Sequence, residues 1–314
     1  MILDKIPKPL PFRTQEEIMS EWLQTSGPVV SILCATFNHV DFIEDAILGF
    51  LGQVTDFSFE VIIRDDASTD GTAEVVRTYA ASHPKIIQPI FEEKNTYPGK
   101  KPLACMMGVA SGKYIALCEG DDYWIDEHKI FKQVEILDAS PTIFLVETKS
   151  VIVDGSRALR VKKQGGTRTY LYRRFDDYPL HRQRYIYFGD TFITNRLRAD
   201  GDTFNLDVVT AVCRKHPGGV WSSIVESDER LLEFRRSMTQ FWLTEYFIDR
   251  HDRERGALHL SRTIEYTLRA FPEIKARTKI ALVVEWSILG RLKILIRALK
   301  NKLRPLYKKL RREG

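Results

Sequence analysis

The chain has 314 residues, of which 44% are hydrophobic and 28% are charged, the ordinary proportions of a globular protein with one large domain or two small ones. The formal net charge of +5 conceals an asymmetry, because ten Lys or Arg and only one acid follow position 290. The rest of the chain is slightly acidic, which excludes a uniformly basic protein.

The cysteines and the apolar runs indicate the compartment. Cys34, Cys105, Cys118 and Cys213 are widely spaced, form no C-x-x-C pair and lie mostly in apolar runs, which is typical of reduced thiols. The first residues lack a signal-peptide pattern, and no apolar run approaches the roughly 18–20 residues of a spanning helix. We therefore expect a cytoplasmic protein.

The predicted elements begin after a Pro-punctuated lead-in, residues 1–27, that contains one short helix at 16–23. Apolar, β-rich runs and amphipathic helical patterns then alternate along the chain. The predicted strands are 29–35, 59–64, 86–91, 113–118 and 143–147, and the predicted helices are 41–53, 70–82, 101–111 and 126–139. This alternation predicts an α/β fold with a largely parallel sheet flanked by helices.

The pattern weakens between 149 and 188, where only broken strand-like pieces occur. A helix at 190–200 and a strand at 207–213 follow, and the sequence is helical from 227 onward. We expect a catalytic domain at 28–225, with halves 28–148 and 149–225, and a helical C-terminal region at 226–314.

The C-terminal segment 278–314 combines apolar residues at helical spacing with Lys and Arg. Such a helix suits peripheral attachment to an anionic membrane surface, here the inner face of the cell membrane. Packing on the domain with a solvated tail is the equal alternative. A nucleic-acid partner is not expected, because no base-reading module is recognisable.

Polar clusters follow three of the predicted strands. They are Thr36-Phe37-Asn38, the stretch from Asp65 to Thr72, and the stretch from Glu119 to Trp124. Because parallel strands end at one edge of a sheet, these clusters should converge there. Gathered carboxylates repel one another, so the pattern favours a bound divalent cation with oxygen ligands. For Ser68, Thr69 and Asp70, capping of the following helix is an equal alternative.

Three motifs, VSILCATFNH, FEVIIRDDASTDGT and GKYIALCEGDDYW, resemble in order and spacing the N-terminal half of family 2 glycosyltransferases. The resemblance covers 28–148 and, more loosely, 185–225. It implies a glycosyltransferase-A-type, Rossmann-like fold that binds a nucleotide-diphosphate sugar, UDP-sugar above all. It also implies inverting, metal-dependent transfer to an acceptor hydroxyl of a glycan or lipid-linked glycan, in bacterial polysaccharide, O-antigen or capsule assembly.

The resemblance also assigns roles at matching positions. Nucleotide-sugar contacts fall on a set from the three motifs and two later segments: Ala35, Phe37, Asn38, Asp65, Asp66, Lys101, Asp121 and Arg214. Metal ligands, for Mg²⁺ or Mn²⁺, fall on Asp122, Asp121, Glu119 and His216. Asp121 is placed near the ribose and Asp122 on the metal. Glu119 stands where many relatives have Asp.

The catalytic base in this family is an acid that opens a helix well downstream of the metal motif. Asp190, which follows YIYFG, matches that position and would deprotonate the acceptor hydroxyl. Asp176, Asp177 and Asp207 are the alternative candidates. The segment RKHPGG resembles the Arg-x-His element of many relatives, so Arg214 would contact phosphate and His216 the metal or diphosphate.

Two other functions fit parts of the pattern. A nucleotidyltransferase uses similar carboxylate and metal chemistry, but it would normally have a Gly-rich basic loop directly after the first strand, and ATFNHVDF lacks one. A non-catalytic nucleotide-sugar or glycan-binding module is conceivable, because the acceptor-side stretch before Asp190 is short and basic. The donor sugar, the acceptor and the oligomeric state are not determined by these patterns.

Overall fold

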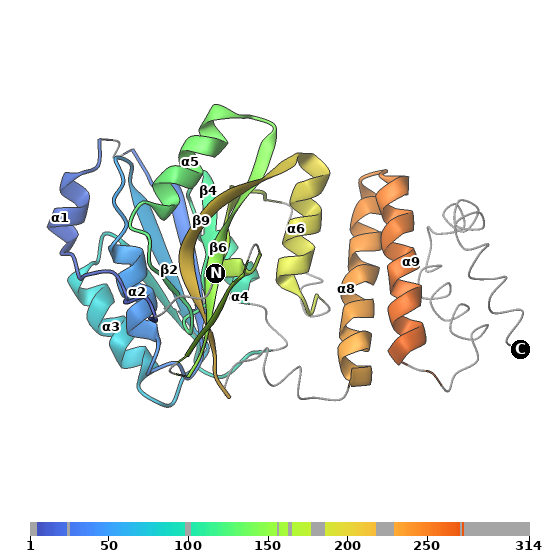
Figure 1. Cartoon of the computed structure of the whole chain (residues 1–314), viewed down its shortest axis with the longest axis horizontal. Coiled ribbons are helices and arrows are strands. Elements are labelled where there is room, and N and C mark those ends of the chain that lie inside the picture. The colour runs from blue at the N-terminus through green and yellow to red at the C-terminus, as the bar shows by residue number, and fades with distance from the viewer. Residues whose placement is uncertain are drawn as a thin grey trace, which may run out of the picture. The chain divides into compact units, whose positions relative to one another are not determined.

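The computed structural model describes residues 5–23, 26–97, 102–155, 157–162, 165–176, 186–217, 229–270 and 272. The chain divides into two compact units. Met1–Gln183 and Leu197–Gly219 form the first, which we call the sheet unit, and Arg184–Arg196 and Val220–Gly314 form the second, the helical unit (Figure 1). The domain limits expected from the sequence remain predictions.

One sheet contains all the strands of the described residues, and its order is β3-β2-β1-β4-β8-β6-β9-β5, with β7 beside β6. The strands are β1 (Val30–Thr36), β2 (Phe59–Asp65), β3 (Ile87–Phe91), β4 (Tyr114–Leu117), β5 (Tyr123–Trp124), β6 (Ile143–Asp154), β7 (Arg157–Lys162), β8 (Tyr170–Arg173) and β9 (Asp202–Lys215). The pairings make β1, β2, β3, β4, β6 and β9 run in one direction, whereas β5, β7 and β8 run against them. The expected α/β class and mostly parallel sheet are confirmed.

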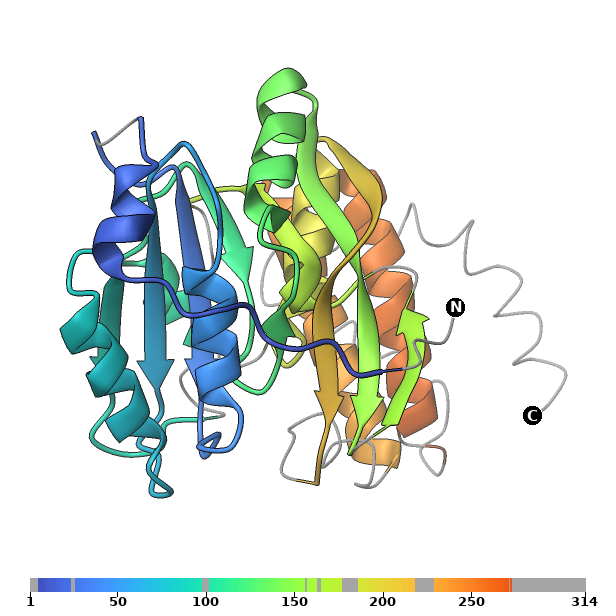
Figure 2. The ribbon, with the colours of Figure 1, turned by 60° about the vertical axis from the view of Figure 1, so that its left-hand side comes forward.

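Helices cover both faces of the parallel strands (Figures 1 and 2). They are α1 (Gln15–Ser20), α2 (Ile43–Leu51), α3 (Thr72–Ser82), α4 (Pro102–Met107) and α5 (Lys129–Ala139). Apolar residues of α1, α2, α3 and α5 form one core with alternate residues of β1 and β2, including Ile32 and Val61. Because successive side chains of a strand point to opposite faces, Leu33 and Ile62 face the other side, where α4 packs.

The predicted strands and helices up to residue 147 are all present, with ends shifted by a few residues. Two features differ from the prediction. β6 continues to Asp154 instead of ending at 147, and β5 was not predicted because two residues carry no periodicity. β5 pairs with β9 through Tyr123 and Val212, so the turn after β4 is tied to the end of β9.

The helical unit is built on α8 (Glu229–Asp249) and α9 (Arg253–Ala270), which lie side by side as an antiparallel pair (Figure 1). The first turns of α6 (Gly189–Asp200) belong to this unit as well. Buried apolar side chains join α8 to α9, and the ring of Phe247 stacks on His259 at 5.2 Å. The helical pattern expected at the start of this region is confirmed.

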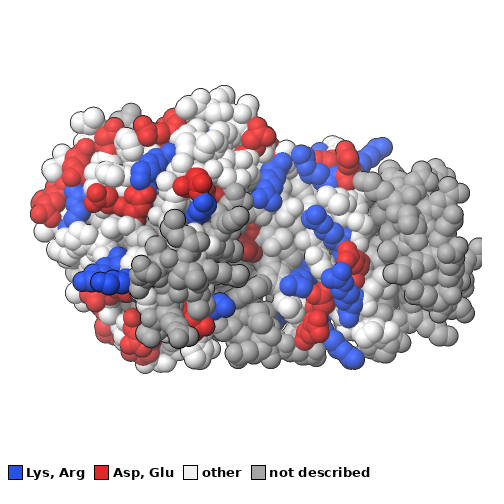
Figure 3. All heavy atoms as spheres, viewed as in Figure 1, with Lys and Arg blue, Asp and Glu red and all other residues white. Residues whose placement is uncertain are grey.

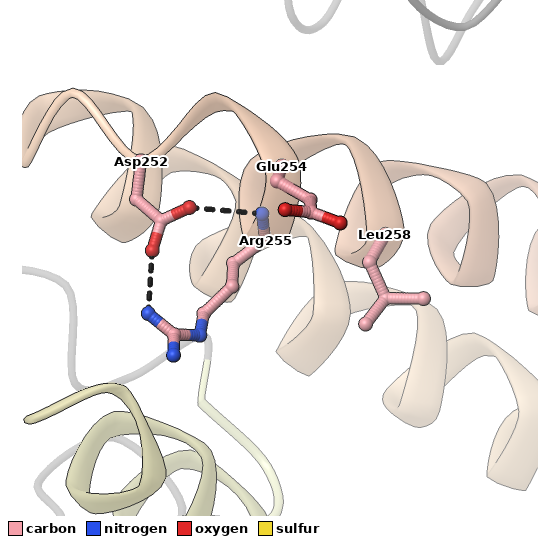
Figure 4. A pocket seen from close by; sticks show the side chains of 4 residues that line it. All are labelled: Asp252, Glu254, Arg255 and Leu258. Atoms are coloured by element: carbon pink, nitrogen blue, oxygen red, sulfur yellow. Dashed lines mark hydrogen bonds and ion pairs between the residues drawn. The ribbon is translucent and has the colours of Figure 1, made fainter. Parts of the chain in front are cut away.

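A shallow hollow lies at the start of α9, lined by Asp252, Glu254, Arg255 and Leu258. Asp252 accepts hydrogen bonds from both the backbone and the guanidinium of Arg255, so the two charges neutralise each other (Figure 4). Acidic and basic side chains are interspersed over the described surface of this unit on the face shown in Figure 3. Asp252 and Arg255 are therefore engaged with each other at the start of α9.

Across the described ranges, every helix is either too short or too polar to cross a lipid bilayer. The basic amphipathic segment predicted at 278–314 lies outside the described residues, and the two interpretations of it stay open.

Candidate active site at the carboxyl edge of the sheet

Three loops meet where the parallel strands end. β1 lies between β2 and β4, with Thr36 opposite Asp65 in the register and Leu33 opposite Leu117. The connections from β1 and to β4 leave on opposite sides, so this edge is the topological switch point at which open α/β sheets bind ligands. The polar clusters that follow these strands in the sequence are thereby brought to one edge.

Gly120 lets the loop after β4 lie directly against β1. Its backbone nitrogen donates to the carbonyl of Ala35 at 2.9 Å. A Cβ at this position would lie 2.7 Å from Oγ1 of Thr36, which is closer than real side chains approach. Glycine is required here by this close contact, which holds the turn between Glu119 and Asp121 against the end of β1.

The loops after β1 and β2 are hydrogen-bonded to each other. The amide of Asn38 donates to Oγ of Ser68 at 2.9 Å, and the amide of Thr69 donates to Oδ1 of Asn38 at 2.9 Å. Asp65 accepts from the amide and hydroxyl of Ser68. Asn38 and Ala67 have positive φ values of 53° and 62°, so both loops turn sharply. Asn38 and Asp65 therefore shape the loops of this edge.

Asp66 is buried and organises the segment after β3. It accepts hydrogen bonds from the amide and hydroxyl of Thr96, from the amide of Tyr97, and from the buried guanidinium of Arg64 at 2.9 Å. Burial alone would raise the pKa of Asp66, but these hydrogen bonds and the Arg64 charge outweigh it and hold the pKa below its ordinary value. Asp66 is thus an ionised anchor of the loop that precedes α4.

Asp122 points into the protein. Its Oδ2 accepts from Nη1 of Arg168 at 2.9 Å, and its Oδ1 accepts from the backbone nitrogen of Arg214 at 2.8 Å. Arg168 lies in the 3₁₀ turn η1 (Thr167–Thr169), which connects β7 to β8. Burial raises the pKa of Asp122 to about 6, although the charge of Arg168 opposes this. Both oxygens of Asp122 are engaged with groups of the protein itself.

Glu119 accepts a hydrogen bond from the hydroxyl of Thr167 at 2.5 Å. Burial, followed by the charge of Asp122, raises the pKa of Glu119 to about 7. Neighbouring residues of η1, Thr167 and Arg168, therefore hold the two outer carboxylates of the EGDD segment.

Asp121, between them, faces two imidazole rings. Its Oδ2 lies 3.1 Å from Nε2 of His216, and ligand atoms of His39, Asp121 and His216 all lie within 4.8 Å of one another. Burial alone would raise the pKa of Asp121, but the hydrogen bond to His216 and the nearby His39 lower it. Burial lowers the pKa of His39. An ionised carboxylate beside imidazole nitrogens is a donor set that fits a divalent cation.

His39 was not predictable as a site residue from the motifs. Its only sequence signal was its place directly after Asn38, in the loop that ends β1. The family resemblance assigns nucleotide-sugar contacts to that loop, and it assigns the metal ligands to the EGDD and RKH segments. His39 and His216 lie close together because of the order of β1, β4 and β9 in the sheet.

The side chain of Arg214 is enclosed by the sheet unit. Its guanidinium lies 4.2 Å from the ring centre of Tyr123 and 5.3 Å from that of Phe42. It donates to the carbonyl of Asp121 at 3.2 Å and forms an ion pair with Asp45. Arg214 therefore fixes the turn that carries Asp121, and its charge lies beside the candidate cation site.

Two of the remaining predicted nucleotide-sugar residues, Ala35 and Phe37, lie at the same edge. Ala35 is half-buried at the end of β1, and Phe37, 40% exposed, is one of the large apolar side chains left open to solvent. The third, Lys101, lies outside the described residues.

Asp190 lies in the first turn of α6, in the helical unit, and is exposed. Its Oδ1 accepts from the amide of Thr191 at 2.7 Å. The expectation that an acid opens a helix here agrees with the structure, while its role as the base stays a prediction. Of the alternatives, Asp176 pairs with Arg174 and Asp207 with Lys149, and Asp177 lies outside the described residues.

Comparisons with known proteins connect this geometry to a family. The family model described as Glycosyl transferase family 2 matches residues 31–200. The Mycobacterium tuberculosis protein Rv1520 is 32% identical over 229 residues, which are 66% of this chain and 64% of that protein. The match therefore spans less than two thirds of this relative.

Two further similarities are weaker, because one covers a shorter stretch of the chain and the other has a lower sequence identity. The Escherichia coli UDP-Glc:alpha-D-GlcNAc-diphosphoundecaprenol beta-1,3-glucosyltransferase WfaP is 33% identical over 118 residues, 37% of this chain and 44% of WfaP. The structure of S. aureus TarS 1-349 with UDP-GlcNAc aligns with a TM-score of 0.49 at 17% identity, covering 80% of this chain and 87% of that one. Because the family match includes β1, β2, β4 and the polar loops that follow them, the chain belongs to glycosyl transferase family 2.

Proposed function

We propose that the chain is a metal-dependent, inverting glycosyltransferase that moves a sugar from a nucleotide-diphosphate sugar to an acceptor hydroxyl. The observation that carries this proposal is the position of Asp121, between His39 and His216, at the switch point of the sheet. A cation held there lies at the edge where open α/β sheets bind ligands. Family membership supports sugar transfer as the reaction.

UDP-sugars are the donors we propose first, because the relative WfaP is named for a UDP-glucose reaction. The exposed Phe37 and the half-buried Ala35 offer an apolar surface for the base beside β1. Asp66, directly after β2, holds the segment that follows β3 at this edge by accepting from Thr96 and Tyr97. A divalent cation at Asp121 and His216 would supply charge neutralisation for the departing diphosphate.

Transfer in a single displacement requires a proton acceptor on the acceptor side of the sugar. The acceptor oxygen bonds to the anomeric carbon, the bond from that carbon to the diphosphate oxygen breaks, and the hydroxyl proton goes to a carboxylate. We assign Asp190 as this carboxylate, because it is an exposed acid in the first turn of α6. A single displacement inverts the anomeric configuration.

The acceptor and the cellular role follow from the family resemblance and from the name of WfaP. We propose a glycan or lipid-linked glycan acceptor in polysaccharide, O-antigen or capsule assembly, on the cytoplasmic side of the membrane. Attachment to that membrane through 278–314 remains a prediction about residues outside the described ranges.

The proposal is tested by donor turnover without an acceptor. The purified chain is incubated with UDP-glucose, UDP-GlcNAc or GDP-mannose, and release of the nucleoside diphosphate is measured with Mn²⁺, with Mg²⁺ and after EDTA treatment. We expect slow hydrolysis of one donor that stops with EDTA and returns with Mn²⁺.

Asp121→Asn should lower this turnover at least about 100-fold, since it removes the central carboxylate of the site. Asp56→Asn is the matched control, because Asp56 is exposed and precedes β2 at the opposite edge of the sheet. Tight binding of a donor without turnover, with or without metal, would instead support a binding module. Release that is unaffected by EDTA would refute the metal dependence.

A further inference from the structure

His39 lies beside two of the four predicted metal ligands, Asp121 and His216, and comes from a third segment of the chain. Asp121 follows β4, His216 follows β9, and His39 follows β1, yet their ligand atoms lie within 4.8 Å of one another. The rings of His39 and His216 are 5.9 Å apart, close to perpendicular. Two imidazoles and one carboxylate therefore converge on one point.

The backbone holds His39 in this place. Asn38 turns the chain with a positive φ, and the amide of His39 then donates to Oγ1 of Thr72 at 2.8 Å. Thr72 is itself fixed, because its amide and hydroxyl both donate to Asp70. Asp70 thus accepts from the first amide of α3 and, through Thr72, helps to position His39, while a binding role for Asp70 and its neighbours stays a prediction.

One nitrogen of the His39 ring lacks a hydrogen-bond partner among the described residues. This atom, Nδ1, is buried. A buried polar atom without a partner costs free energy, and it is uncommon in native proteins. This cost is removed if a bound ion or ligand gives Nδ1 a partner.

The other acids of the EGDD segment are engaged elsewhere. Asp122 uses both oxygens on Arg168 and the backbone of Arg214, and Glu119 accepts from Thr167. Carboxylates so engaged are less available to a cation than Asp121, whose Oδ2 partner is the imidazole of His216. The donor set that remains is rich in nitrogen.

We propose that His39 is the third protein ligand of the divalent cation, together with Asp121 and His216. Imidazole nitrogen suits first-row transition ions, whereas Mg²⁺ prefers an all-oxygen shell. The site should therefore favour Mn²⁺ over Mg²⁺ and leave open positions for diphosphate oxygens. This proposal rests on the metal dependence proposed above, and it names the residue that decides which ion is used.

The test is Mn²⁺ binding to the full chain without donor, so that it does not depend on turnover. Free Mn²⁺ is followed by electron paramagnetic resonance during titration, and pulsed spectra of ¹⁵N-histidine-labelled protein count the coordinated imidazoles. The unchanged chain should show two imidazoles, and His39→Ala should show one. His39→Ala should also weaken Mn²⁺ binding at least about 10-fold, because even residues that only support metal ligands contribute that much.

His128→Ala is the matched control, because His128 lies partly exposed before α5 and forms an ion pair with the exposed Glu127. It should leave both readouts unchanged. Thermal melting shows whether His39→Ala remains folded, and His39→Gln, which keeps a side chain of similar length, provides a second variant. Competition with Mg²⁺ should show that Mn²⁺ binds more tightly than Mg²⁺.

One coordinated imidazole in the unchanged chain, or Mn²⁺ affinity unaffected by both substitutions, would overturn the role of His39. Equal affinity for Mg²⁺ and Mn²⁺ would overturn the metal preference. Two coordinated imidazoles in a chain that turns over no nucleotide sugar would support this site while refuting the proposed function, so the two failures are distinguishable.

Discussion

The Oδ1 atom of Asp122 accepts a hydrogen bond from the backbone nitrogen of Arg214 at 2.8 Å, across 92 residues of sequence. The same bond lies next to the pairing of β5 with β9, so the turn after β4 and the end of β9 are joined twice. His216 follows two residues later and reaches Asp121. Asp122 thus positions the residues that we assign to the cation.

Breaking the buried pair of Asp122 and Arg168 should destabilise the sheet unit. Arg168→Met leaves the Asp122 carboxylate buried without its cation, and such changes lower the free energy of unfolding by about 3–5 kcal/mol. Asp122→Asn combined with Arg168→Met should recover part of that loss. Chemical denaturation of the single and double variants measures the coupling between the two residues.

If Asp122 positions the site without binding the metal, Asp122→Asn should retain two coordinated imidazoles in the Mn²⁺ spectra. Loss of Mn²⁺ binding in a folded Asp122→Asn variant would instead support the sequence-based assignment of Asp122 as a ligand. Equal stability of Arg168→Met and the unchanged chain would contradict the importance of the buried pair.

Gly120→Ala should disturb the site through crowding alone. The new methyl group would lie 2.7 Å from Oγ1 of Thr36, so either β1 or the EGDD loop must move. We expect a loss of about 1–3 kcal/mol in the free energy of unfolding, together with weaker Mn²⁺ binding because Asp121 is the next residue. Gly108→Ala is the control, since its nearest neighbour would lie at an ordinary 3.4 Å. Equal effects of the two substitutions would argue against a crowded Gly120.

Asp190→Asn should separate transfer from donor binding. A general base contributes about 10²–10⁴-fold to a rate, so transfer should fall by that factor while the affinity for donor stays the same. Asp176→Asn and Asp207→Asn are matched comparisons, because both residues are exposed and paired with basic side chains. They should transfer normally. Loss of folding or of donor binding in Asp190→Asn would indicate a structural role at the start of α6.

The helical unit should lose stability in mild acid through His259. Burial, with the charges of Arg262 and Arg255, lowers the pKa of His259 from 6.5 to about 4, while Asp252 opposes the shift. Its Nδ1 lies 2.7 Å from Oε1 of Gln240. Between pH 6.5 and pH 4 the unfolded chain binds a proton that the folded chain does not, so stability is full above pH 6.5 and falls as the pH decreases.

Through His259 alone, the free energy of unfolding should fall by about 3 kcal/mol between pH 6.5 and pH 4. Melting temperatures of the unchanged chain and of His259→Gln, measured from pH 7 to pH 4, should therefore converge as the pH falls. Parallel curves across this range would show that His259 does not titrate as its burial indicates. The variant removes the titrating group while keeping a polar side chain opposite Gln240.

Much of the fold was predictable because its signals are local. Alternating apolar runs indicated β1, β2 and β4 within a residue or two, and the polar clusters after them indicated which edge of the sheet carries chemistry. The motifs also indicated the family, which the family match confirms. The long extent of β6 and the two residues of β5 were not predictable, because pairing with β9 defines both.

The sequence by itself determined the α/β class and the presence of carboxylates after the parallel strands, since each depends on residues close together in the chain. Only the tertiary structure decided that Asp121 faces His39 and His216 while Asp122 turns inward to Arg168. These contacts depend on the order of β1, β4 and β9 in the sheet and on the position of η1. Contacts between residues so far apart depend on packing across the whole sheet, which local sequence patterns do not encode.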